Sequence, residues 1–220
     1  VDDLVELSQS LISSEQNTFV VWFNADEAEH YDTDSGRPIY TQGASSSTYA
    51  NYAIGIRSDG IYIELGNPSN NGVHKLTDPI NFNTWYHLAV VFNSGVITTY
   101  LNGIIESIID VPFTTINPNN IGGYIGNRWG LDNQNNGGYK FNGKIDDLQG
   151  WDTALPEVHI QYYMSTSPGG NEGQLVGYWN FNEGEGSTLN DLSGNGNNGT
   201  INGATWTGDV PVLGCTDPYA

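Results

Sequence analysis

Residues 85–109 read WYHLAVVFNSGVITTYLNGIIESII, and this stretch decides the fold class. β-Branched and aromatic residues fill 85–92, 96–101 and 104–109, which is the composition of strands rather than of helices. Asn102 and Gly103 lie between the last two runs, and both can adopt the positive φ that a two-residue hairpin turn requires. The stretch therefore predicts a strand followed by an antiparallel hairpin over residues 96–109.

The same pattern continues along almost the whole chain. Short apolar runs alternate with clusters of Gly, Asn and Asp, and the further predicted strands are residues 4–7, 18–24, 38–42, 52–57, 61–65, 121–126, 143–151, 175–181 and 200–206. Further Asn-Gly pairs, which are interpreted as short connections, begin at Asn71, Asn142, Asn198 and Asn202. Helical spacing occurs only at residues 155–164, where Val158, Ile160 and Tyr163 are spaced to cover a sheet edge.

So many strands in 220 residues predict an all-β fold, namely a two-sheet antiparallel jelly-roll sandwich with one short helix. A closed barrel is the alternative. The aromatic residues Trp22, Trp85, Trp151 and Trp179 lie in strand patterns and are interpreted as core. His87 is interpreted as a strand residue near the surface.

Charge excludes several classes of function. The chain has 25 Asp and Glu residues against 6 Lys and Arg, a formal net charge of −19. Such a surface repels phosphate backbones and anionic lipids, so nucleic acid is not an expected partner. No apolar run has the length needed to span a bilayer, and membrane insertion is not expected either.

We expect one domain over residues 1–213, in which residues 175–206 return to complete the sandwich. The chain has one cysteine, Cys215, which cannot form a disulfide within the chain. Residues 214–220 are interpreted as the start of a following module or a linker. The expected molecule is a monomeric piece of a larger protein.

Four blocks carry a family pattern: TFVVWFNAD (18–26), NTWYHLAVVF (83–92), TYLNGI (99–104) and FNGKIDDLQGW (141–151). In this order they resemble the laminin-G-like domains of the concanavalin A-like lectin/glucanase superfamily in bacterial extracellular proteins. In most members a segment similar to residues 175–200 precedes the strand similar to VDDLVEL, so the chain resembles a circularly permuted member. The resemblance implies a secreted or cell-surface location.

The segment DLSGNGNNG, residues 191–199, is the strongest candidate metal site. Its glycines let the backbone coil so that oxygens of Asp191, Ser193, Asn195 and Asn197 can converge, as Ca²⁺ prefers. Resemblance to calcium-binding sandwiches favours Asp147 as a further ligand, with Asp146 as the alternative, and strand alternation predicts that the two point to opposite faces. The other interpretation is a Gly/Asn loop that Asp191 caps through an Asx-turn.

Two other segments are candidates for ligand binding. The loop at residues 127–139 combines an aromatic face for a pyranose with planar hydrogen-bonding groups, in Arg128, Trp129, Asp132, Asn133 and Tyr139. A lid packed over the end of the sheet is the alternative for Trp129. Residues 26–34 form a second acidic segment, interpreted as a solvated loop in which His30 and Tyr31 could instead line a ligand groove.

No catalytic constellation is found. Glycosidases of this general fold carry a Glu-x-Asp-x-x-Glu motif on one strand. This motif is absent here, and the four histidines are scattered along the sequence. The sequence therefore predicts a non-catalytic, calcium-stabilised carbohydrate-binding module that takes a polysaccharide or glycan. A protein-binding adhesion or spacer module, with a cell-surface protein as partner, is the second hypothesis, and a glycoside hydrolase or polysaccharide lyase is the third.

Overall fold

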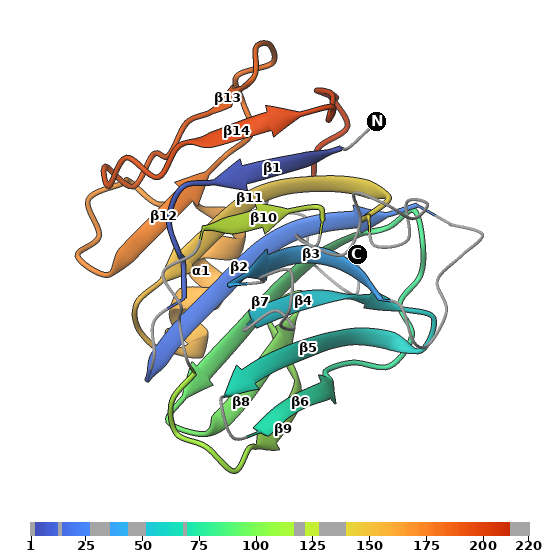
Figure 1. Ribbon diagram of the computed structural model, residues 1–220, viewed down its shortest axis with the longest axis vertical. Helices are drawn as coiled ribbons and strands as arrows, with labels where there is room; N and C mark the ends of the chain where they lie inside the picture. The colour runs from blue at the N-terminus through green and yellow to red at the C-terminus, as the bar shows by residue number, and fades with distance from the viewer. Residues whose placement is uncertain are drawn as a thin grey trace.

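The computed structural model describes residues 3–12, 15–26, 36–43, 52–67, 70–116, 122–127 and 140–211. In these residues the chain folds into two antiparallel sheets packed face to face (Figure 1). The predicted all-β jelly-roll sandwich is confirmed. Among the described helices, none is long and apolar enough to cross a membrane.

The first sheet has eight strands in the described residues. Their spatial order is β13 (Thr188–Leu189), β14 (Gly199–Asn202), β1 (Leu4–Leu7), β10 (Gly123–Ile125), β3 (Arg37–Gln42), β4 (Tyr52–Arg57), β5 (Gly60–Asn67) and β6 (Asn70–Lys75). Asn71, interpreted from the sequence as the start of a connection, instead lies inside β6. The pairing of β5 with β6 supplies ladder hydrogen bonds that outweigh the local turn preference of Asn-Gly.

The second sheet has six strands within the same described ranges. Their spatial order is β12 (Leu175–Trp179), β11 (Gly143–Trp151), β2 (Gln16–Ala25), β7 (Trp85–Asn93), β8 (Val96–Leu101) and β9 (Ile104–Asp110). The hairpin predicted over residues 96–109 is confirmed: Leu101 pairs with Ile104, and Asn102 and Gly103 have φ of 51° and 77°.

The C-terminal strands join both sheets. β14 pairs with β1, where Val5 lies opposite Ile201, and β12 pairs with β11, where Leu148 lies opposite Trp179. Figure 1 shows β14 lying directly beside the N-terminal strand β1. The last described residues thus contribute to the same sandwich as the first.

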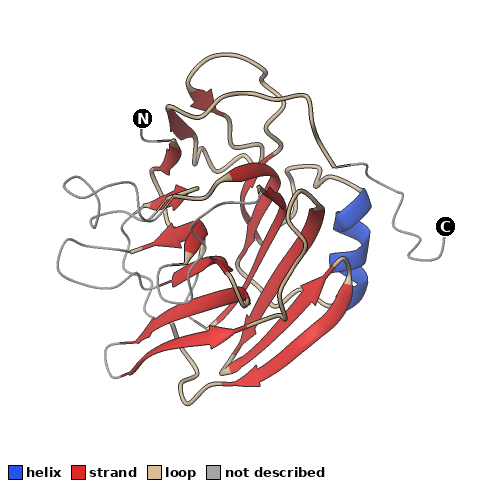
Figure 2. Cartoon of the chain, turned by 90° about the vertical axis from the view of Figure 1, so that its right-hand side faces the viewer, coloured by secondary structure: helices blue, strands red, loops and turns tan. Residues whose placement is uncertain are grey.

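Alternation along β2 divides its side chains between two apolar clusters. Phe19, Val21 and Phe23 belong to the main core between the sheets, whereas Val20 belongs to a second cluster on the outer face of the six-stranded sheet. Figure 2 shows the helix α1 (Glu157–Ser165) lying against this outer face. Ile160 of the helix is fully buried there.

The helix corrects two expectations from the sequence. It covers the face of the sheet rather than an edge, and Val158 is 65% exposed instead of packing inward. Trp151 is buried as predicted, but in the outer cluster beneath the helix rather than between the sheets. Periodicity predicts that a side chain is buried, but it does not identify the layer that buries it.

His87 lies on β7 and is fully buried, so its predicted surface position is wrong. Its ring packs edge-on against Trp22 on the neighbouring strand, with ring centroids 5.2 Å apart. Burial lowers the pKa of His87 to about 3, because the imidazolium form would lose its hydration. The side chain is therefore a neutral member of the outer face.

Candidate functional site

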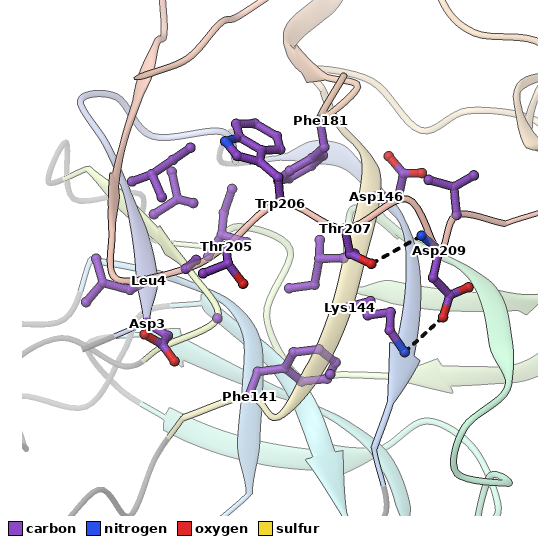
Figure 3. A pocket seen from close by; sticks show the side chains of 18 of the residues that line it. Asp3, Leu4, Phe141, Lys144, Asp146, Phe181, Thr205, Trp206, Thr207 and Asp209 are labelled. Carbon is purple, nitrogen blue, oxygen red and sulfur yellow. Dashed lines mark hydrogen bonds and ion pairs between the residues drawn. The ribbon is translucent and has the colours of Figure 1, made fainter. Parts of the chain in front are cut away.

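The free edge of β11 is the feature around which the site forms. β12 pairs with Leu148 to Trp151, which leaves residues 143–147 of β11 without a strand on that side in the described chain. Residues 204–210, which we call the strap, continue from β14 and lie across this free edge (Figure 3). A cavity of about 160 Å³ lies between the strap, the free edge of β11 and the facing strand β1.

One half of the cavity, which we call the aromatic half, opens toward the core. Phe141, Phe181 and Trp206 line it together with Leu4 and Ile201. Figure 3 shows the rings of Trp206 and Phe181 lying close together above the strand, with Phe141 below. This half offers flat apolar faces.

The other half, the charged half, lies beyond the β11 backbone. Lys144 Nζ is 3.0 Å from Asp209 Oδ2 of the strap and 3.9 Å from Asp26 Oδ1. Trp85 Nε1 donates a hydrogen bond of 3.3 Å to the other oxygen of Asp209. The hydrogen bond from Lys144 lowers the pKa of the Asp209 carboxyl, and these contacts fasten the strap to β11 and β7.

Asp146 lines the same half but has no such partner. Its Oδ1 accepts the Asp147 N–H at 2.9 Å, and no cationic side chain among the described residues pairs with it. Burial, with a smaller contribution from the Asp147 charge, raises the pKa of Asp146 to about 6. The carboxylate is thus partly desolvated without a compensating charge.

The backbone of Ile145 also faces the free edge. The Asp26 N–H donates to Asn142 O, so residues 26 and 142 form a hydrogen-bonded pair of β2 and β11. Hydrogen-bonded and non-bonded pairs alternate along an antiparallel ladder, so Lys144 and Asp146 are the next residues of β11 that bond β2. Ile145 between them directs its N–H and C=O away from β2, toward the strap. No hydrogen bond joins these two groups to another described residue.

A β-bulge changes the position of Asp147. The β2–β11 register shifts between Asp146 and Gln149, and Asp147 has a φ of 47°. Its Oδ1 accepts Gln149 Nε2 at 3.1 Å, and Gln149 Oε1 accepts Trp151 Nε1 at 3.1 Å, both on the outer face. Asp146 and Asp147 therefore share one face, and the expectation of opposite faces is wrong because the bulge interrupts alternation.

The Asp191 carboxylate organises its own loop. Oδ1 accepts N–H groups of Tyr178 and Ser193 at 3.0 and 2.9 Å, and Oδ2 accepts the Asn197 N–H at 2.8 Å. The Asp191 N–H in turn donates to Asn198 Oδ1 at 2.9 Å. These bonds close the loop in the manner of an extended Asx-turn.

The other predicted ligands in this loop converge on β12. Ser193 Oγ and Asn197 Nδ2 donate to Val176 O at 3.2 and 2.7 Å, and Asn195 Nδ2 donates to Leu175 O at 2.8 Å. The loop thereby covers the outer backbone edge of β12, which would otherwise be exposed. The groups that meet there are mainly donors, whereas Ca²⁺ takes oxygen ligands, so their arrangement does not form an oxygen cage.

Asp146 and Asp147 lie on the other side of β12 from this loop. One edge of β12 pairs with β11, and the opposite edge takes the bonds from the loop. Two strand spacings of about 4.8 Å then separate the loop backbone from β11. The structure brings Asp191, Ser193, Asn195 and Asn197 together but not with Asp146 or Asp147, and the bound calcium stays a prediction.

The predicted sugar-binding side chains lie outside the described residues: His30, Tyr31, Arg128, Trp129, Asp132, Asn133 and Tyr139. Some described residues near the ends of these segments lie at or near the cavity. Phe141 N–H donates to Gly126 O at 2.9 Å, and both residues line the cavity. Asp26, which precedes the other segment, lies within 3.9 Å of Lys144 in the charged half.

Sequence reasoning missed two tryptophans of the cavity. Trp85 was expected in the core but is only partly buried and donates to Asp209. Trp206 was included in a predicted strand, although the structure places it in the strap. A signal was present, because Trp206 stands in the polar segment ATWTGD, the same context that singled out Trp129.

The sequence and fold now define the class of protein. A model of the concanavalin A-like lectin/glucanases superfamily matches residues 1–161, and the chain belongs to this family. A comparison with curated proteins finds no match to the sequence.

Solved structures share the fold at low identity. A candidate carbohydrate-binding protein of Bacteroides ovatus is similar with a TM-score of 0.74 and 22% identity, over 96% of this chain and 59% of that one. The chain therefore spans less than two thirds of the Bacteroides protein. A heptameric pentraxin of Limulus polyphemus is similar with a TM-score of 0.55 and 22% identity, over 73% of this chain and 75% of that one.

A third similar structure is domain 4 of AbnA, an extracellular arabinanase of Geobacillus stearothermophilus, in complex with arabinotriose. Its TM-score is 0.53 and its identity 21%, over 71% of this chain and 70% of that one. At these identities the likeness establishes the fold alone.

Proposed function

We propose that this domain is a non-catalytic carbohydrate-binding module that holds one sugar ring in the cavity under the strap. The observation that carries the proposal is the pairing, in one cavity, of aromatic faces with hydrogen-bonding groups. Aromatic faces pack on the C–H face of a pyranose, and directional polar groups select its hydroxyls.

The size of the cavity supports a small cyclic ligand. A cavity of about 150 Å³ in another protein binds a benzene ring, and this cavity has about 160 Å³. The free Ile145 N–H and C=O supply a donor and an acceptor beside the ring. The enclosed volume is thus on the scale of one small ring, and a sugar would extend through the opening of the cavity.

The family and the similar structures support the same proposal. The family includes lectins by its description, and the AbnA domain was solved with a bound oligosaccharide. An extracellular location of this chain follows as part of the proposal, because the AbnA domain belongs to an extracellular enzyme.

The carboxylates argue against catalysis. Glycosidases place two carboxyl groups on opposite sides of the scissile bond, about 5–10 Å apart. Asp3, Asp146 and Asp209 line the cavity here, but Asp209 is already held by Lys144 and Trp85, and Asp146 accepts the Asp147 N–H. We therefore expect no sugar release from polysaccharides incubated with the domain.

The test is isothermal titration of the domain with a panel of monosaccharides and short oligosaccharides. Trp206→Ala removes an aromatic wall, and we expect it to weaken sugar binding by about two- to tenfold, since aromatic packing contributes about 0.5–1.5 kcal/mol. Tyr162→Ala is the matched control, because Tyr162 is 55% exposed on α1 and does not line the cavity. Trp129→Ala tests the neighbouring loop in the same titration.

Melting curves of each variant separate loss of binding from loss of folding. A folded Trp206→Ala variant with unchanged sugar affinity would contradict the proposed cavity. An absence of binding by any sugar would contradict the proposed function itself.

Protein binding is the second candidate, and one observation favours it. Ile104, Ile105 and Ile108 on the edge strand β9 are 63%, 44% and 62% exposed. Exposed apolar residues in a row are typical of interaction surfaces. Triple substitution of these isoleucines by Thr should leave every sugar titration unchanged if the cavity is the binding site.

A further inference from the structure

We infer that the cavity selects a sugar that carries a free amino group, held as an ammonium ion against the Asp146 carboxylate, and that it rejects anionic sugars. This inference rests on the proposed function and adds the charge of the ligand to it.

The charge balance of the cavity is the first argument. Asp3, Asp146 and Asp209 line it together with one cationic side chain, Lys144. Lys144 is already paired with Asp209 at 3.0 Å. Among the described lining residues no cation remains for a carboxylate or sulfate on a sugar, and the net charge of −19 adds long-range repulsion.

The position of Asp146 is the second argument. Its carboxylate is partly buried, accepts one backbone N–H and has no counter-ion among the described residues. An opposite charge within hydrogen-bond distance stabilises the ionised form of such a carboxylate. A ligand ammonium supplies three donors and one positive charge, whereas the described residues supply Asp146 with one donor, the Asp147 N–H, and no positive charge within ion-pair distance.

The arrangement of the two halves is the third argument. Figure 3 shows Asp146, Lys144 and Asp209 on one side of the β11 strand and Trp206 and Phe181 on the other. A ring that packs on the aromatic half can direct one substituent past Ile145 to Asp146. A primary amine attached to a sugar ring joins both kinds of contact in one small molecule.

The test compares glucosamine, glucose and glucuronate by titration at pH 7. We expect glucosamine to bind on the order of tenfold more tightly than glucose, and glucuronate to bind most weakly, because a hydrogen bond between charged groups is stronger than one between neutral groups. Asp146→Asn keeps the shape of the side chain and should remove the preference while glucose binding persists. Asp152→Asn is the control, since Asp152 is exposed and does not line the cavity.

The pH dependence gives an independent readout. Burial raises the pKa of Asp146 to about 6, so the carboxylate loses its charge as the pH falls through that value. Glucosamine affinity should fall between pH 7 and 5, whereas glucose affinity should change little. Asp147 on its own strand and Tyr178 on β12 are the titratable groups that interact with Asp146. Lys144, Asp209 and Asp3 line the same cavity, and Asp26 lies 3.9 Å from Lys144.

The outcomes separate this inference from the proposed function. Equal affinities for glucose and glucosamine, unchanged by Asp146→Asn, would overturn the inference and leave the sugar module standing. Failure of all three sugars and of the wider panel would overturn both. If free lysine bound as tightly as glucosamine, the site would bind amines without selecting a sugar, and the inference would be overturned. If Ca²⁺ stabilised the wild type but not Asp146→Asn, the carboxylate would be a metal ligand, and the inference would be overturned as well.

Discussion

Two carboxylates on opposite sides of β12 have contrasting surroundings. Asp191 accepts three backbone N–H groups within its loop, whereas Asp146 accepts one and lines a cavity. Internal hydrogen bonds that use both oxygens of a carboxylate indicate a structural role. A partly buried carboxylate beside a cavity, without a counter-ion among the described residues, supports the proposed binding role, because an opposite charge on a ligand would lower its electrostatic cost.

The strand edges next to the two carboxylates also differ. The Asp191 loop covers the outer edge of β12 with hydrogen bonds to Tyr178 N–H and Val176 O. The strap passes the free edge of β11 without bonding the Ile145 backbone, among the described residues. One edge is closed by the chain itself, whereas the other keeps the Ile145 N–H and C=O unbonded among the described residues.

The largest expected effect is on the closed side. Asp191→Ala leaves the N–H groups of Tyr178, Ser193 and Asn197 without their acceptor and should lower the free energy of unfolding by about 3 kcal/mol, at about 1 kcal/mol per lost bond. Urea denaturation measures this change. Asp152→Ala, at an exposed position, is the control and should leave the free energy of unfolding unchanged. An equal loss in the two variants would contradict the structural role of the Asp191 hydrogen bonds.

His87 provides an unpaired polar group that does not line the cavity, so it should affect stability rather than binding. The folded-state pKa of about 3 lies below the unfolded value of about 6.5. The unfolded chain therefore binds more protons between these values, and stability falls as the pH drops below about 6.5. At pH 5 the loss from this residue is about 2 kcal/mol.

His87→Phe keeps an aromatic ring at the position that packs edge-on against Trp22 and removes the titratable group. The wild type should lose more stability than His87→Phe between pH 7 and 5 in parallel denaturation curves. Asp146 acts with the opposite sign, because its raised pKa lets the folded chain take up a proton first, but this contribution is common to both proteins and cancels. Parallel curves for the two proteins would contradict a neutral buried imidazole.

Asp209→Asn should move binding more than stability. Asp209 is exposed, and surface ion pairs contribute little to stability, so the melting temperature should stay nearly constant. Without the Asp209 charge, Lys144 keeps only the longer contact to Asp26, at 3.9 Å, and becomes more available to an anionic ligand. Glucuronate affinity should therefore rise relative to that of the wild type, and an unchanged value would show that Lys144 is not accessible from the cavity.

The smallest effect should come from removing divalent metal. The Asp191 loop is closed by hydrogen bonds to β12, so EDTA should leave the melting temperature of the domain unchanged. A decrease in EDTA that Ca²⁺ reverses would support the sequence-based calcium prediction instead. By linkage it would amount to about 2.7 kcal/mol at a metal concentration a hundredfold above the dissociation constant.

The fold was predictable from local chemistry, and the site only in part. Strand runs and the turn at Asn102 and Gly103 encode the hairpin directly, since a two-residue turn depends on neighbouring residues alone. The composition of DLSGNGNNG marked a tight loop, and one of its two interpretations, the cap by Asp191, describes the observed hydrogen bonds. Whether Trp206 lines a cavity depends on β11 and β1, which are far away in sequence.

By itself the sequence determined the strand content, the turns, the acidic character and the buried status of most aromatic residues, because these follow from properties of neighbouring residues. Tertiary structure alone decided that helix α1 buries Trp151, that a bulge turns Asp146 and Asp147 to one face, and that residues 204–210 cross the free edge of β11. The reason is that layer, register shift and edge are relations between distant segments, which no local pattern contains.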